Sequence, residues 1–559
     1  MGIVEDLKTE LQAARSERLF FENDWLDYVT YSAPDMERAF NNANGVSAPD
    51  GMTAFRRSAA RERSRKLYDP TAVWLLDRLT SGVGSLTMPE GFHWHGVGFG
   101  DPFASDPSKV EEEFFETFRD HLFRIRYSGK SGFALNNRSR LVSTVKLGTG
   151  ILFPLENEET LSDIRTPVHY RYVPLYEIYL IVDALGNDCG FFRVRKLKAW
   201  QAVKEYGDKV SSDVKEDAND PKRKNNEHSF VHAVFKREGG YQDAVDISRS
   251  RYESIHFEEK TKHINRTGGF FEYPLVVSRW DRDGLSPYGS PPQAKLMSDI
   301  KSLQSLARDA LVASSQAVRP PIATHMEERQ LDLNPGRTNP GLIDEQGRPL
   351  FRSMIDTVNP GAADTQIENI REKLRVGLYG DLWQTLLEGN GRTATEANIR
   401  RKEMADMIGP FSTNILAGNE NLFEREVGIL SRRGAFVPGS ALEPPESIAQ
   451  REVTLTSTAP IDQMREAGHF EAIMGFQEYL GIAAQSDPTI LDLHDREEEY
   501  DLTRRALGLP AKLRRDDEEV AKIREKRAEG QEREQQLVIG ESVARMAKDG
   551  APMLNVLQE

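Results

Sequence analysis

Residues 319–361 carry six prolines and four glycines, and this segment separates two stretches of helical periodicity. Because proline has no amide hydrogen and blocks the interior of a helix, most of the segment cannot be helical. The sequence therefore predicts two helices joined by a non-helical insertion, the first over 293–317 and roughly 38 Å long. Apolar residues on one face define both helices: Leu296, Ile300, Leu303, Ala307 and Ala310 in the first, and Ile367, Ile370, Leu374 and Leu378 in the second.

A glycine-rich loop and a third helix follow this pair. Thr365-x-x-Glu368 has the spacing of a capping box and predicts the start of the second helix, and Thr393-x-x-Glu396 predicts the start of the third. The loop between them holds Gly389-Asn390-Gly391-Arg392. Gly409-Pro410 should kink the third helix, and Arg432-Arg433-Gly434 should end it. Within the insertion, Leu342-Ile343 and Leu350-Phe351 flank Gln346-Gly347 and predict a short hairpin. This order is typical of a channel wall and carries no catalytic motif.

The regions around this block predict an α+β fold. Helical patterns cover 3–31, about 56–65, 70–88 (with Asp69 as its cap) and 111–127, and the strand-like runs begin near residue 166. Gly186-Asn187-Asp188 predicts a hairpin turn, and the polar tract 207–229 predicts an exposed loop. The strands expected are 168–173, 176–183, 191–196, 231–236, 252–257 and 275–280, with a later strand at 453–458 and helices at 460–482, 494–508 and 512–548.

The composition narrows the class of protein. The formal charge of −15 and the pI near 5.4 argue against a protein that grips nucleic acid by general attraction, because phosphate binding needs clustered Lys and Arg. An acidic wall would still let a duplex pass without sticking. The single cysteine, Cys189, leaves no internal disulfide and fits assembly in a reducing cytoplasm. The sequence also has no apolar run long enough for a membrane-spanning helix and no secretory signal pattern.

The candidate catalytic motifs all fail on spacing, so we expect no enzymatic activity, no cofactor and no metal. Gly129-Lys130-Ser131 resembles the end of a phosphate-binding loop, but Arg124 occupies the position of the required glycine. The glycine-rich stretch 96–100 lacks the dinucleotide fingerprint and predicts a loop between helices. His93-Trp94-His95 has two imidazoles but no third ligand, and predicts an aromatic loop.

Several phrases along nearly the whole chain resemble the portal proteins, or head-to-tail connectors, of short-tailed phages (podoviruses). Each phrase is weak alone, and their order and spacing carry the resemblance. They are RSRKLYDPTAVWLLDRLTSGVGSLTMP at 63–89, Val173-Pro174-Leu175 with Phe192-Arg193-Val194, RWDRDGLSPYGS at 279–290, Arg319-Pro320-Pro321 and RTATE at 392–396.

The resemblance implies a portal-type fold that assembles into a ring, which has twelve copies in that family. It implies an outer wing at 1–288 and 393–510, a stem made of the helices at 289–318 and 362–380, and a small α/β clip at 319–361. It further implies a channel loop at 381–392 and a helical crown at 511–559, with any extended C-terminal barrel short or absent.

The same resemblance implies a virion protein of the capsid vertex between head and tail, assembled in the host cytoplasm. Double-stranded DNA would pass through it non-specifically during packaging and ejection, and its partners would be the terminase large subunit, tail or adaptor proteins, capsid and scaffolding proteins. We expect DNA contacts from Lys301, Arg308, Arg371, Arg375 and the loop Gly389, Asn390, Gly391 and Arg392, and we expect this loop to change shape as DNA moves. The terminase and adaptor docking candidates are Arg329, Arg337, Arg348, Phe351 and Arg352.

Two alternatives stay open at the level of sequence. Another phage neck or tail protein, such as an adaptor ring, would share the virion location, but it need not carry two helices with an inserted clip. A nucleotide-dependent enzyme is disfavoured by the missing phosphate loop.

Overall fold

The computed structural model describes residues 2–34, 36, 67–101, 103, 106–157, 167–239, 246–318, 322–324, 343–344, 346–353, 360–381, 394–449, 451–506, 509, 511–515 and 517–555. The chain forms two compact units. The first comprises 1–95, 121–443 and 457–465, and the second comprises 96–120, 444–456 and 466–559. The predicted helix at 56–65 lies outside the described residues.

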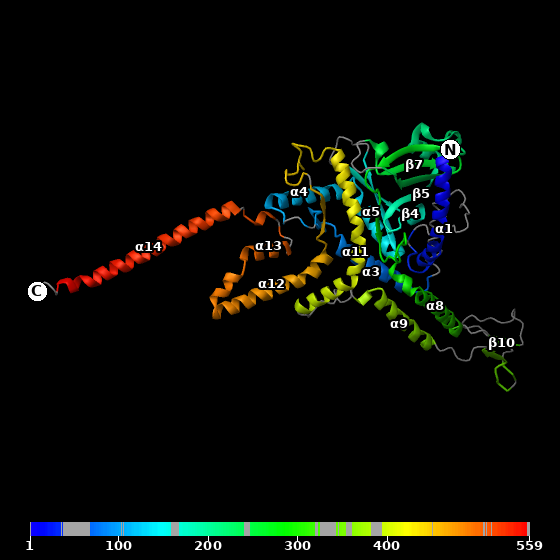
Figure 1. Ribbon diagram of the computed structural model, residues 1–559. Coiled ribbons are helices and arrows are strands. Elements are labelled where there is room, and N and C mark those ends of the chain that lie inside the picture. Colours follow the sequence, from blue (N-terminus) through cyan, green and yellow to red (C-terminus); the bar gives the residue numbers. More distant parts are fainter. Residues whose placement is uncertain are drawn as a thin grey trace. The chain divides into compact units, whose positions relative to one another are not determined.

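Two antiparallel sheets form the centre of the first unit (Figure 1). The five-stranded sheet has the order β4-β5-β6-β7-β8, with bounds Ile178–Val182, Asp188–Lys198, Glu227–Lys236, Tyr252–Glu258 and Ile264–Phe270. The three-stranded sheet has the order β3-β2-β9, with bounds Val168–Val173, Thr149–Glu156 and Val276–Arg279. The predicted hairpin at Gly186-Asn187-Asp188 is confirmed, since β4 and β5 pair antiparallel across it. Strands β2 and β8 fall outside the predicted set.

Most of the predicted helices are confirmed, and three more appear. Helices α1 (Gly2–Tyr31), α3 (Thr71–Thr87) and α4 (Lys109–Arg126) lie where the periodicity placed them. Helix α5 (Phe133–Leu147) was not predicted, because its sequence FALNNRSRLVSTVKL mixes polar and β-branched residues without a clean apolar stripe. The prediction of an exposed loop at 207–229 was wrong. Helix α6 (Ala199–Tyr206) leads into that tract, and α7 (Ser212–Asn219) lies within it and buries Val214 against α6 and the sheet.

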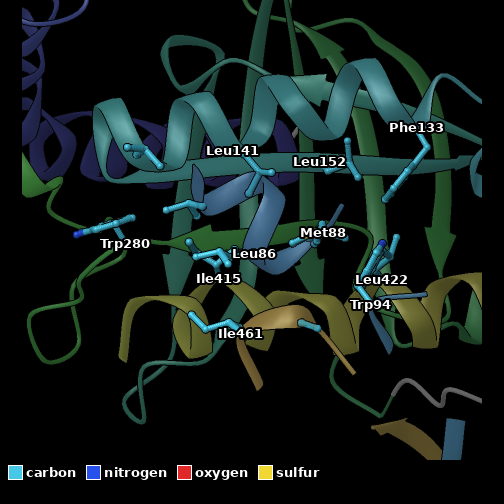
Figure 2. Packing of buried hydrophobic residues seen from close by; sticks show 14 of the residues in the cluster. Leu86, Met88, Trp94, Phe133, Leu141, Leu152, Trp280, Ile415, Leu422 and Ile461 are labelled. Atoms are coloured by element: carbon cyan, nitrogen blue, oxygen red, sulfur yellow. The ribbon is translucent and has the colours of Figure 1, made fainter. Parts of the chain in front are cut away.

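The alternation of strand side chains places the two sheets face to face. In β5, Phe191 joins a core with Ile151 and Phe153 of the three-stranded sheet, while its neighbour Phe192 joins a core with Leu7 of α1 on the opposite face. The other face of the three-stranded sheet packs on helices and forms a second core (Figure 2). The labelled residues of that core are Leu86, Met88, Trp94, Phe133, Leu141, Leu152, Trp280, Ile415, Leu422 and Ile461.

Helix α11 (Ala394–Arg432) supplies much of that core and crosses β9 closely. A Cβ at Gly418 would lie 2.6 Å from the backbone oxygen of Val277, so only glycine permits this approach. The helix continues through Pro410, and Figure 1 shows α11 bending partway along its length, as predicted. Its predicted end is confirmed, since Gly434 adopts φ 72° directly after the last turn.

A buried ion pair ties α11 to α4. Arg126 donates from Nε and from a terminal nitrogen to the two oxygens of Glu426, at 2.9 and 2.6 Å, and both side chains are at most 1% exposed. The Tyr170 hydroxyl donates to the same carboxylate, and His95 contacts the Arg126 guanidinium. His95 therefore belongs to a buried polar core, in agreement with a structural role for the His93-Trp94-His95 segment.

Two imidazoles stack on one face of the five-stranded sheet, from the paired strands β6 and β7. The rings of His232 and His256 are 3.9 Å apart and nearly parallel, and Tyr206 contacts Nδ1 of His256 at 3.1 Å. Burial, together with the positive charges of Arg195 and Arg266, lowers the pKa of His256 to about 3. Burial and the neighbouring His256 likewise hold the pKa of His232 well below its ordinary value. Folding therefore favours the neutral form of both rings.

This pair predicts a loss of stability in mild acid. An unfolded histidine titrates near pH 6.5, so between there and pH ~3 the unfolded chain binds more protons than the fold, and the free energy of unfolding falls as pH drops. Each histidine contributes a slope of at most ~1.4 kcal/mol per pH unit. Urea titrations at pH 5, 6 and 7 should give a shallower slope for His256→Gln than for the wild type. Equal slopes for this variant and the wild type would contradict the assignment.

The second unit joins α4 to the C-terminal helices. Here the predicted loop at 96–100 was wrong, because β1 (His95–Phe99) is a strand paired with β12 (Val453–Ser457). Gly98 and Gly100 lie close to the partner strand, where a Cβ would meet Thr456 and Glu452 at 3.2 and 3.1 Å. The glycines therefore serve close strand packing.

Helices α12 (Pro460–Ser486), α13 (Arg496–Ala506) and α14 (Asp517–Asn555) follow, close to their predicted positions. Arg504 of α13 donates to Glu112 of α4 at 2.6 Å, and Arg514 donates to Asp501 at 2.5 Å. The backbone amide of Ala511 donates to Glu116 at 2.7 Å, so the residues before α14 are held to α4 by charged hydrogen bonds. Figure 1 shows α14 itself as one uninterrupted helix.

Candidate functional site

The helix pair at the centre of the sequence pattern is present and shares its own core. Helix α8 (Met297–Val318) follows a 3-10 turn at Pro292–Leu296, and α9 (Pro360–Gly377) packs against it. Ile300 and Leu303 of α8 meet Ile367 and Leu374 of α9, all at most 7% exposed. The predicted start of the second helix was wrong: α9 begins at Pro360, so Thr365 lies inside the helix, five residues after its start. Proline suits the first turn, where its missing amide hydrogen costs no bond.

A buried carboxylate joins this pair to α3. Asp69, 1% exposed, accepts a hydrogen bond from the backbone amide of Thr71, the first residue of α3, at 2.9 Å. The predicted cap was wrong by one residue, because Pro70 is the N-cap of α3. Arg371 of α9 donates two hydrogen bonds to the other oxygen of Asp69, at 3.0 and 2.7 Å. Gln304 of α8 accepts from the backbone amide of Asp69 at 3.0 Å and donates to its carbonyl at 2.7 Å. We call Asp69, Gln304 and Arg371 the stem junction.

The electrostatics of the stem junction favour the charged form of Asp69. Burial raises the pKa of this carboxyl, but hydrogen bonds from Thr71 and Arg371 outweigh burial, and the pKa lies below its usual range. The hydrogen bond to Asp69 in turn raises the pKa of Arg371. Folding therefore favours ionised Asp69: this contribution to stability is fully present above the pKa of an unfolded Asp, about 3.9, and is lost as pH falls through the lowered pKa of the folded state.

The stem junction predicts a stability loss when Arg371 is removed. Arg371→Gln leaves the buried carboxylate without its cation and should lower the free energy of unfolding by about 1–2 kcal/mol. The matched control is Arg375→Gln, one turn further along α9, whose exposed pair with Glu372 should contribute less than ~0.5 kcal/mol. Urea denaturation of both variants measures the difference. Equal losses for the two variants would show that Arg371 is an ordinary surface residue.

The four described cations predicted to contact DNA all carry carboxylate partners within the chain. Lys301 pairs with Asp27 of α1 at 2.6 Å, and Arg308 lies 3.3 Å from Asp309. Arg371 belongs to the stem junction and also lies 3.2 Å from Glu368. Arg375 pairs with Glu372 on the same helix. Each of these cations is partly or fully exposed, but none offers an unneutralised charge.

The docking candidates are only partly within the described residues. Arg329 and Arg337 lie outside them. The loop predicted to contact DNA, Gly389, Asn390, Gly391 and Arg392, also lies outside the described residues. The predicted hairpin is supported by a bridge between Ile343 and Pro349, and its turn is held by Asp344, which pairs with Arg348 at 2.8 Å. Phe351 and Arg352 instead belong to β11 (Phe351–Ser353), which pairs with β10 (Ile322–Thr324). Arg352 is exposed there.

The described residues were also searched for a phosphate-binding loop, a metal site and a membrane-spanning helix. Lys130 lies in the turn between α4 and α5, and neighbouring Ser131 donates its hydroxyl to the backbone oxygen of Ser128 at 2.9 Å. Within the described ranges, no three His, Cys, Asp or Glu side chains converge as a metal site would require. None of the described helices combines the length and apolarity needed to cross a membrane.

Sequence reasoning missed the role of Gln304. The signal was present, because Gln304 falls beside Leu303 and one turn before Ala307, on the apolar face of the first predicted helix. A polar side chain at a buried position needs a hydrogen-bond partner. The partner, the backbone of Asp69, is 235 residues distant in the chain, which no local pattern reveals.

Comparison with known proteins matches nearly the whole chain. The family model described as bacteriophage head to tail connecting protein matches residues 4–514. The portal protein of Salmonella phage epsilon15 is 25% identical over 561 residues, covering 97% of this chain and 94% of that protein. The probable portal protein of Bordetella phage BPP-1 is 22% identical over 536 residues, covering 94% of this chain and 91% of that protein.

Proposed function

The chain belongs to the bacteriophage head to tail connecting protein family, and from this membership we propose that it is a portal protein that forms a ring at one capsid vertex. Double-stranded DNA would enter the head through this ring during packaging and leave through it during ejection. The matches to two phage portal proteins over more than nine-tenths of the chain carry this proposal.

The proposed division of labour follows the segments of the chain. Residues 1–288 and 393–510 would form the wing, the α8 and α9 segments (289–318 and 362–380) the stem, and 319–361 the clip. Residues 381–392 would form the channel loop and 511–559 the crown. Twelve copies would close the ring through heterologous contacts, in which two different surfaces of each copy meet.

The charge of the stem helices supports a channel wall. Helix α8 carries two acidic and two basic residues, and α9 carries three of each, so both helices are formally neutral in a chain of net charge −15. A formally neutral wall neither repels a duplex strongly nor holds it tightly. Lys301, Arg308 and Arg375 would reach phosphates only by exchanging a carboxylate partner, and exposed pairs of this kind are worth roughly 0–1 kcal/mol. Arg371 would have to leave the buried carboxylate of Asp69.

The partners follow from the same proposal. The clip, with Arg348 and Arg352 on its described surface, would meet the terminase large subunit during packaging and a tail or adaptor protein afterwards. Capsid and scaffolding proteins would surround the wing at the virion vertex, after assembly in the host cytoplasm. No catalytic group, cofactor or metal is proposed, because the energy for DNA movement would come from the terminase.

Electron microscopy of the purified full-length protein tests the proposal. We expect closed rings with a central hole wide enough for a DNA duplex. Heads assembled with this protein and the terminase should then fill with DNA. Purified protein that stays monomeric under all assembly conditions, or heads that fill equally well without it, would count against a portal role.

A further inference from the structure

Helix α9 has two exposed sides of different chemistry. One side carries Glu368, Arg371, Glu372 and Arg375, spaced three and four residues apart, and these side chains pair with one another or with Asp69. The other side carries Gln366, Asn369 and Lys373 at i, i+3 and i+7, which also places them in one row. All three side chains of the second row are exposed. We call this second row the donor stripe.

Lys373 differs from every other basic residue on α8 and α9. In the part of the chain that the structure describes, Lys301, Arg308, Arg371 and Arg375 each lie within 4 Å of a carboxylate, and Lys373 has no such ion pair. Its neighbours in the stripe are amides, which donate hydrogen bonds but carry no charge. The donor stripe therefore presents a single unneutralised cation flanked by neutral hydrogen-bond donors.

We propose that Lys373, with Gln366 and Asn369 beside it, is the phosphate-contacting row of each subunit in the channel. The inference rests on the proposed portal function. It assigns the DNA contact to Lys373, which was not among the cations predicted from the sequence. A phosphate meeting Lys373 displaces only water and counterions, whereas a phosphate meeting Arg371 must break its bonds to the buried Asp69. Lys373 thus interacts with DNA at the lower cost.

A lysine without an ion pair among the described residues, as Lys373 is on α9, suits a duplex that has to move. Lysine is a point charge on a flexible stem, so its interaction with a phosphate has little directional preference. The amides of Gln366 and Asn369 can donate to phosphate oxygens without adding charge. Contacts of this kind are sequence-independent and weaken with salt, and they re-form at the next phosphate as DNA advances.

The test uses charge variants of the full-length protein in packaging. Lys373→Glu places a carboxylate in the donor stripe and should lower the yield of DNA-filled heads at least tenfold, while Lys373→Arg should package within about twofold of the wild type. The matched control is Arg375→Glu, which reverses an exposed charge two residues away on the ion-paired side and should have the smaller effect. Because Lys373 is exposed, rings of all three variants should look alike by electron microscopy.

A second measurement reports contact directly. A photo-crosslinking side chain placed at position 373 should give a DNA adduct in filled heads, several-fold more abundant than the same side chain at position 375. If Lys373→Glu packages like the wild type, or if the adduct is absent at 373, the donor stripe does not contact DNA. Those outcomes leave the portal function intact, because the wild-type rings and filled heads test that function separately.

Discussion

Replacing Glu426 by glutamine should lower the free energy of unfolding by about 3–5 kcal/mol, since breaking one partner of a buried ion pair leaves an uncompensated charge. Arg126 and Glu426 are at most 1% exposed, so water cannot solvate the remaining guanidinium. Tyr170 and His95 contact this pair as well, and their hydrogen bonds lose part of their geometry. The urea midpoint of the purified protein measures the loss.

A double variant separates the effect of the buried charges on stability from the effect of packing. The double variant Arg126→Met/Glu426→Met removes both charges and should recover most of the lost stability, because well-packed apolar residues often replace a buried pair without cost. Glu372→Gln is the surface control: its partner Arg375 is 40% exposed, and the change should cost less than ~0.5 kcal/mol. A single variant as stable as this control would show that the pair contributes nothing to the fold.

Gly148→Ala should destabilise the protein by about 2–4 kcal/mol, from a steric clash added to an unfavourable backbone conformation. Gly148 ends α5 with φ 84°, and a Cβ there would lie 2.1 Å from the backbone oxygen of Gly289. Its carbonyl also accepts a hydrogen bond from the amide of Trp280 at 2.9 Å. The crowded contact joins α5 to the segment that leads into α8, so the change should also loosen the start of α8.

Gly91→Ala supplies the control for this position. Gly91 has φ 80°, nearly the same backbone conformation, but a Cβ there would meet nothing within 4 Å. Gly91→Ala should therefore lower the free energy of unfolding by only about 1 kcal/mol, which is the part of the effect due to backbone conformation. Urea denaturation of the two variants isolates the contribution of close packing, and equal losses would show that the Gly148–Gly289 approach can widen freely.

The helix pair and its insertion were predictable because proline chemistry and helical periodicity act locally. The same is true of the hairpin at Gly186-Asn187-Asp188 and of the glycine end of α11 at Gly434. Where local signals were misleading, tertiary packing explains the error. The glycines at 96–100 indicated a loop, yet Gly98 and Gly100 allow a partner strand to approach. The capping box at Thr365 had the right spacing, but α9 starts five residues earlier at Pro360.

For the basic residues of the candidate site, too, the sequence and the tertiary structure supplied different information. The sequence identified which residues of the two helices are basic, and it could not tell which of them are neutralised. The partners of Lys301 and Arg371 are Asp27 and Asp69, which lie 274 and 302 residues away along the chain. Only folding brings these carboxylates to the helices, and their presence is what distinguishes Lys373 from the other cations.

The order of the described helices, the α+β class and the family resemblance thus followed from the sequence, because periodicity, turn chemistry and motif order are properties of neighbouring residues. The tertiary structure alone decided which charges are buried, which are paired and which glycines are crowded. Those properties depend on groups far apart in the chain that meet only in a packed core, where the loss of water makes each pairing energetically significant.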